Sequence, residues 1–173
     1  LPGGAAFPEP LLRPLMFGGH QEGGLRPSTE NVPGIAGFSR AIELAEEMLT
    51  GEAVRLTSLR DYCVHGLLKA FPGAWLNGPG DRRLPGNINM CFPGFNAYEL
   101  MLVLDRYGIA CSSGSACATA SSEPSHVLTA IGLCSRDARS SLRFTLGLYT
   151  THEEIDFFIA ALSQAAKEVL TLQ

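Results

Sequence analysis

The chain has 173 residues, a hydrophobic content of 46% and a formal net charge of −4. This length is enough for one domain with a buried core, and the apolar content is that of an ordinary globular protein. The sequence has no run of lysine and arginine that would predict binding to nucleic acid or to a membrane surface, no apolar stretch of the roughly 20 residues that span a bilayer, and no secretory signal pattern in its first residues.

The first 70 residues are expected to form a loop-rich segment followed by helix. Many of the glycines and prolines lie in residues 1–28, which predicts extended loop structure. After Pro33, apolar residues recur at helical spacing, and the same pattern returns over residues 54–70. Gly51, between the two patterns, is expected to break or bend the helix.

Two strands are expected in the centre of the chain. Residues 74–77 and 87–92 have apolar and β-forming side chains bounded by glycine and proline turns. The stretch between them, residues 77–85, is expected to be a surface loop. Trp75 is expected to anchor the core, because a tryptophan buries a large apolar area.

Two helices and a further strand are expected next. Residues 97–107 predict a helix with Gly108 as its C-cap, and the short helix over residues 127–131 is ended by Gly132. Between them, the apolar residues 107–111 predict a buried strand.

The last segment predicts a half-buried strand and a terminal helix. Apolar and polar residues alternate over residues 142–146, as they do in a strand with one face in the core. Thr151 and Glu154 have the spacing of a capping box, which opens the terminal helix. The order of elements predicts an α/β fold in which a short mixed sheet packs with helices.

The cysteines point to one reactive thiol. There are five of them, an odd number at irregular spacing without a Cys-x-x-Cys pair, which argues against a zinc site or a thioredoxin-like motif. Cys117 follows the sequence Ser-Ser-Gly-Ser-Ala, whose residues cannot bury it, so its thiol is expected to be accessible. From these residues alone, a nucleophile and an incidental surface cysteine remain equal alternatives.

The other four cysteines are expected to pack as small hydrophobic residues, because they lie in or beside apolar segments. They are Cys63, Cys91, Cys111 and Cys134. Free thiols fit a reducing compartment best, the cytosol or an organelle matrix. The histidines, at positions 20, 65, 126 and 152, do not pair at metal-binding spacing, so no metal site is expected.

Three blocks carry a family resemblance. Residues 18–33 read GGHQEGGLRPSTENVP, residues 112–117 read SSGSAC and are followed by Glu-Pro-Ser, and residues 141–147 read SLRFTLG. In this order, the blocks resemble the C-terminal part of NifS-type cysteine desulfurases, which are pyridoxal-phosphate enzymes of the class V aminotransferase fold. The resemblance implies the small C-terminal domain of a fold type I transferase over residues 34–173, preceded by a lead-in, residues 1–33.

The resemblance also implies three site residues. Cys117, on a mobile catalytic loop at about residues 111–126, would take sulfur from L-cysteine and leave L-alanine and a persulfide. Arg143 would hold the α-carboxylate of the substrate. Thr29 would bind the phosphate of the neighbouring subunit's pyridoxal phosphate, which implies a homodimer. The sequence departs from the family pattern at His20 and Ser28, where the family has glycine, and at Gly23, where it has arginine.

The Schiff-base lysine of the family has no counterpart here. The two lysines, Lys69 and Lys167, lie in helical patterns, and the family's lysine would precede Leu1. The chain is therefore expected to lack an N-terminal cofactor domain and to be inactive alone, the complete enzyme supplying sulfur to an acceptor protein, as in iron–sulfur cluster assembly. The alternatives are a selenocysteine lyase of the same fold, a non-enzymatic persulfide carrier or thiol sensor, and an inert remnant that only dimerises.

Overall fold

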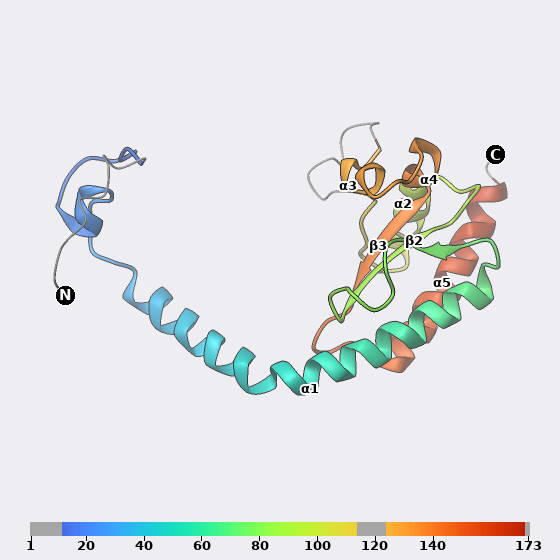
Figure 1. Cartoon of the computed structure of the whole chain (residues 1–173), viewed down its shortest axis with the longest axis horizontal. Helices are drawn as coiled ribbons and strands as arrows, with labels where there is room; N and C mark the ends of the chain where they lie inside the picture. The colour runs from blue at the N-terminus through green and yellow to red at the C-terminus, as the bar shows by residue number, and fades with distance from the viewer. Residues whose placement is uncertain (1–11, 114–123, 172–173) are drawn as a thin grey trace. The chain divides into compact units, whose positions relative to one another are not determined.

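A computed structural model describes residues 12–113 and 124–171 of the chain (Figure 1). The chain divides into two units, Leu1–Met48 and Leu49–Gln173. The described part of the first unit contains a short 3₁₀ helix, η1 (Gln21–Gly24), and the beginning of the long helix α1 (Val32–Ala70). The second unit contains the rest of α1 and every strand that the described residues form.

Helix α1 is continuous, and the expected break at Gly51 is wrong. Asn31 starts the helix: its side-chain Oδ1 accepts the backbone N–H of Gly34 at 3.1 Å. A glycine inside a helix costs about 1 kcal/mol relative to alanine, which is too little to stop a helix that continues with good helix formers such as Glu52 and Ala53. The C-terminal half of α1 is then fixed by packing, with Leu59, Cys63 and Leu67 buried.

The sheet has three strands in the order β1-β2-β3, and both pairings are antiparallel, where a mixed sheet was expected. The strands are β1 (Trp75–Leu76), β2 (Asn87–Cys91) and β3 (Ser141–Thr145). The expected strand over residues 107–111 does not form. Gly108, at φ +74°, turns the chain after the preceding helix, and only Ser112 reaches the sheet, as an isolated bridge to Arg143.

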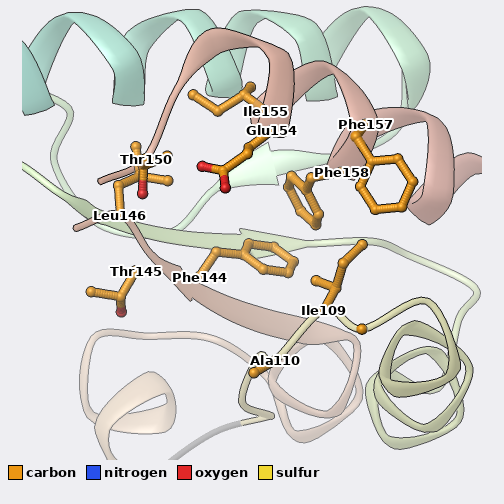
Figure 2. Close-up of a pocket in the computed structure, with 11 residues that line it drawn as sticks. Ile109, Ala110, Phe144, Thr145, Leu146, Thr150, Glu154, Ile155, Phe157 and Phe158 are labelled. Carbon is orange, nitrogen blue, oxygen red and sulfur yellow. The ribbon is translucent and has the colours of Figure 1, made fainter. Parts of the chain in front are cut away.

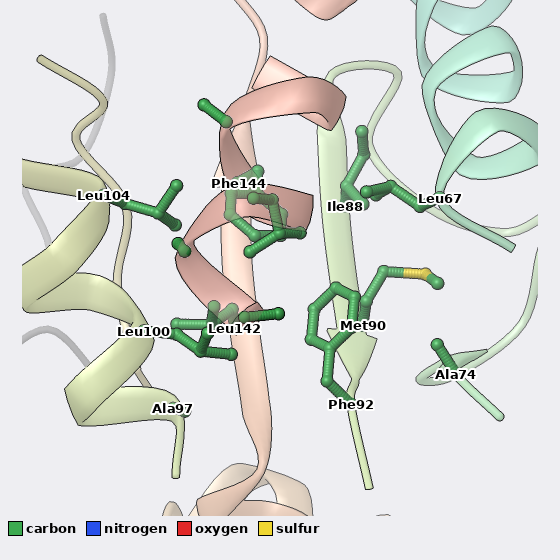
Figure 3. Packing of buried hydrophobic residues seen from close by; sticks show 14 of the residues in the cluster. Leu67, Ala74, Ile88, Met90, Phe92, Ala97, Leu100, Leu104, Leu142 and Phe144 are labelled. Carbon is green, nitrogen blue, oxygen red and sulfur yellow. The ribbon is translucent and has the colours of Figure 1, made fainter. Parts of the chain in front are cut away.

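Helices α2 (Ala97–Arg106) and α5 (His152–Thr171) share one apolar core with the sheet and α1. Figure 3 shows this core, with Leu100 and Leu104 of α2 facing Leu142 and Phe144 of β3. The capping box of α5 is confirmed, because the Glu154 carboxylate accepts the N–H of Thr151 at 3.0 Å and the Thr151 hydroxyl accepts the N–H of Glu154 at 3.2 Å.

Two short helices, α3 (His126–Ala130) and α4 (Ser135–Arg139), lie between α2 and β3 in the chain. The first was expected, with Gly132 at φ +100° after it; the second was not. The expectation for Trp75 is wrong, because the residue is 38% exposed at the short edge strand β1. The core position beside it is filled by Ala74, which is buried.

Arg55 fixes the loop between β3 and α5. Its guanidinium donates to the backbone oxygens of Gly147 at 3.0 Å, Leu148 at 2.8 Å and Thr150 at 2.9 Å. It also donates twice to the Glu52 carboxylate, both at 2.9 Å, and this hydrogen bonding lowers the pKa of Glu52. The loop that follows β3 is therefore held against α1 by one side chain.

Two glycine substitutions test this packing. Gly51→Ala should stabilise the protein by about 0.5–1 kcal/mol, because a Cβ at this helical position meets no atom within 4 Å. Gly86→Ala should destabilise it by about 1–3 kcal/mol, because a Cβ there would lie 2.6 Å from the backbone oxygen of Leu146. Urea unfolding measures both changes, and a loss of stability in Gly51→Ala would contradict the continuous helix.

Candidate functional site

The candidate site lies on the face of the sheet opposite the core. Successive side chains of a strand point to opposite faces, and in β3 Leu142 and Phe144 are buried in the core. Ser141, Arg143 and Thr145 therefore point to the other face. The expected alternation over residues 142–146 is confirmed, and it directs Arg143 away from the core.

Arg143 lies in the middle of a row of three polar residues. Asn89 of β2 is its register partner on one side, and Ser112 is its partner on the other. The Ser112 N–H donates to the Arg143 oxygen at 3.1 Å, and the Arg143 N–H donates to the Ser112 oxygen at 2.7 Å. Directly opposed residues of antiparallel strands project their side chains to the same face, so all three side chains share the polar face.

A buried hydrogen-bond network supports one end of this row. The Asn77 Nδ2 donates to Asn89 Oδ1 at 2.7 Å and to Ser141 Oγ at 2.9 Å. The Ser141 hydroxyl in turn donates to the backbone oxygen of Asp137 at 2.8 Å. Asn77 is only 4% exposed, although residues 77–85 were expected to be a surface loop. The polar residues Asn87 and Asn89, alternating with buried Ile88 and Met90, were the sequence signal for this polar face.

The charge of Arg143 is available to a ligand. The residue is half-buried, and in the described part of the chain no carboxylate lies within the 4.0 Å that defines a salt bridge to its guanidinium. A guanidinium presents a rigid fork of donors that matches a carboxylate bidentately. The arrangement is therefore suited to binding an anion with two oxygens.

Cys117 lies outside the described residues. Ser112, which pairs with Arg143 of β3, precedes Cys117 by five positions in the chain. A fully extended chain spans at most about 3.6 Å per residue, which limits the distance between the two Cα atoms to about 18 Å. Covalent geometry thus keeps the Cα of Cys117 within about 18 Å of the Cα of Ser112.

The other four cysteines divide into three protected thiols and one exposed thiol. Burial raises the pKa of Cys63 to about 12 and the pKa values of Cys91 and Cys111 to about 11. Cys134, expected to pack as a small hydrophobic residue, is exposed. It occupies the N-cap position of the short helix α4, where the chain runs along the surface.

Thr29 belongs to the first unit and is exposed, in the segment between η1 and α1. Ser28 beside it has φ +77°, a left-handed conformation that favours glycine. The glycine of the family pattern at this position therefore matches the backbone that the chain adopts. Lys69 and Lys167 are exposed on α1 and α5, as expected from their helical patterns.

A pocket of about 420 Å³ lies on the core side of β3 (Figure 2). Its lining includes Ile109, Phe144 and Phe158, and the rings of the two phenylalanines are 4.5 Å apart. Glu154 also lines it, but its carboxylate is engaged in the capping box. None of the three residues of the polar row, Asn89, Ser112 and Arg143, lines this pocket.

The described residues contain neither a metal-ligand cluster nor a membrane-spanning helix. They contain no group of three or more His, Cys, Asp or Glu side chains that could hold a metal ion. Among the same residues, no helix is both long enough and apolar enough to cross a membrane.

Comparison with known proteins gives consistent matches. The family model described as aminotransferase class-V matches residues 11–158. The chain is 44% identical over 161 residues to a protein named cysteine desulfurase IscS from Dictyoglomus turgidum, and 43% identical over 151 residues to a cysteine desulfurase from Klebsiella pneumoniae. These alignments cover 93% and 87% of this chain but only 41% and 38% of the relatives.

Two solved structures of NifS-like proteins also resemble this chain. A NifS-like protein matches with a TM-score of 0.75 at 37% identity, over 90% of this chain and 39% of that one. A NifS-like protein from Rickettsia africae matches with a TM-score of 0.72 at 29% identity, over 89% of this chain and 40% of that one. The chain therefore corresponds to about two fifths of the length of these proteins.

The difference in burial between the cysteines predicts the order in which they react. Iodoacetamide at pH 8 should modify Cys117 fastest and Cys134 next, because thiols with a pKa of about 11 or 12 hold about a thousandth or less of their population as thiolate. Peptide mapping over time measures the order of labelling. Cys134→Ser is the control that leaves Cys117 as the fast site, and early labelling of Cys63 or Cys91 would contradict the burial described above.

Proposed function

The chain belongs to the aminotransferase class-V family, and on that basis we propose that it is the C-terminal part of a pyridoxal-phosphate-dependent cysteine desulfurase. In this proposal Arg143 binds the α-carboxylate of L-cysteine and Cys117 receives its sulfur. The observation that carries it is the backbone pairing of Arg143 with Ser112. Arg143 has no carboxylate partner among the described residues, and Ser112 lies five positions before Cys117 in the chain. The desulfurase names of the relatives support the same activity.

The reaction at Cys117 balances without an external oxidant. The Cys117 sulfur forms a bond to the sulfur of L-cysteine, and the carbon–sulfur bond of the substrate breaks. The substrate carbon takes up a proton in place of sulfur and becomes the methyl group of L-alanine. The carbon is reduced and the sulfur pair is oxidised, so the two thiols become one alanine and one Cys117 persulfide. A thiolate is the form that can start this transfer.

In this proposal the chain supplies only part of the cofactor site. Both lysines are exposed on helices, and the described residues show no glycine-rich backbone beside either of them. Pyridoxal phosphate would supply the electron sink for breaking the carbon–sulfur bond, and its lysine and most of its contacts would come from outside this chain. Thr29 is the one residue that we assign to it, as a hydroxyl for the phosphate of a neighbouring subunit's cofactor in a homodimer.

The wider role follows from the product. A persulfide is a reactive carrier of sulfur, so the complete enzyme would pass it to an acceptor protein, with iron–sulfur cluster assembly as one destination. We place this activity in the cytosol or an organelle matrix, where the reducing conditions preserve free thiols such as the four of the described residues.

Cys117→Ser in the full-length, cofactor-loaded protein should abolish release of sulfide and alanine from L-cysteine, with substrate still bound. A serine hydroxyl is far less nucleophilic toward sulfur than a thiolate. Sulfide production and calorimetric binding of L-cysteine are measured on the same sample, with Cys134→Ser as the matched control. Full turnover in Cys117→Ser would reject the assigned nucleophile.

Arg143→Lys should weaken the binding of L-cysteine by about tenfold or more. Lysine keeps the positive charge but loses the two-pronged geometry, and a hydrogen bond to a charged group contributes about 1.5–3 kcal/mol. The Michaelis constant is compared with that of Arg139→Lys, which alters an exposed arginine of α4. An unchanged constant in Arg143→Lys would mean that another group holds the carboxylate.

A further inference from the structure

The hydroxyl of Ser112 is buried and has no hydrogen-bond partner among the described residues. Such a group is uncommon, because a buried polar atom without a partner loses its hydration without compensation. Unpartnered buried groups are therefore places where a missing ligand is expected.

The pairing with β3 indicates where this hydroxyl lies. Ser112 and Arg143 exchange both of their backbone hydrogen bonds, at 3.1 and 2.7 Å. In such a pair the Cα atoms are about 5.5 Å apart and the two side chains project to the same face. The Ser112 hydroxyl thus lies beside the start of the Arg143 side chain, on the polar face.

Asn89, the partner of Arg143 on the other strand, already has a side-chain hydrogen bond. Because the backbone N–H and oxygen of Arg143 are used by Ser112, the opposite pair, Asn89 and Arg143, is the closer kind without mutual hydrogen bonds. Asn89 Oδ1 accepts a hydrogen bond from Asn77 at 2.7 Å. Asn89 is held in place by this hydrogen bond. The Ser112 hydroxyl, in contrast, donates to no acceptor among the described residues.

We propose that Ser112 is a second substrate-binding residue, whose hydroxyl donates to the α-carboxylate that Arg143 binds. This rests on the proposed function. A carboxylate has about four lone-pair positions and a guanidinium fork fills two of them. A neutral donor beside the fork fills a third and restricts how the carboxylate turns.

The test compares adjacent serines in the full-length, cofactor-loaded protein. Ser112→Ala should raise the KM for L-cysteine about tenfold, equivalent to about 1.4 kcal/mol, with kcat changed less than twofold. Ser113→Ala is the matched control, since Ser113 does not bridge to β3, and should keep the wild-type KM. Ser112→Thr keeps the hydroxyl and should keep the KM within about threefold.

Direct binding separates recognition from turnover. In a Cys117→Ser background, calorimetry should show weaker binding of L-cysteine on Ser112→Ala substitution, and no change for cysteamine, which lacks the carboxylate. Equal losses for both ligands would show a structural role and overturn the proposal. Should Ser112→Ala fail to fold, Ser112→Cys, nearly the same size and a weak donor, takes its place with the same expected increase in KM.

Failure of this inference differs from failure of the proposed function. Wild-type-like KM in Ser112→Ala, with a raised KM in Arg143→Lys, would overturn the role of Ser112 alone. No release of alanine from L-cysteine by the wild-type protein would overturn both.

Discussion

The register between β2 and β3 determines where Asn89 and Arg143 of the candidate site point. Ile88 and Met90 pair with Phe144 and Leu142, and all four are buried in the core. A shift by one residue would move these apolar side chains to the opposite face and would turn Arg143 into the core. The free energy of burying four apolar side chains thus fixes the direction of one arginine, although none of them contacts a ligand.

Two arginines of this unit show how hydrogen bonding separates a structural role from a binding role. Arg55 uses its guanidinium in five hydrogen bonds, two to Glu52 and three to the loop after β3. All three nitrogens of this guanidinium are engaged, so it does not present a free fork of donors to a ligand. Arg143 lies four residues before that loop and has no carboxylate partner among the described residues. The first arginine holds the loop, and the second is the one that the proposed function assigns to a carboxylate from outside.

The local elements could be predicted from the sequence, because their causes are local. The alternation of apolar and polar residues predicted β3, and the capping box predicted the start of α5. The glycines that follow α2 and α3 predicted where these helices end. Exposure and long-range pairing could not be predicted in the same way. Trp75 and Cys134 have apolar neighbours in sequence, but an edge strand and a helix N-cap place them at the surface. The bridge from Ser112 to Arg143 joins residues 31 positions apart, and no local pattern encodes it.

Under the proposed function, the same bridge would let one chain both hold the substrate and pass on its sulfur. A persulfide has to form where the substrate is bound and has to be released where an acceptor can reach it. The binding arginine must be rigid, because a bidentate contact tolerates little misorientation, and β3 is paired on both sides at Arg143. Cys117 is joined to that strand through Ser112 by five residues, which span at most about 18 Å. In this proposal the sheet fixes the position of Arg143, and the covalent chain keeps the Cα of Cys117 within about 18 Å of the Cα of Ser112.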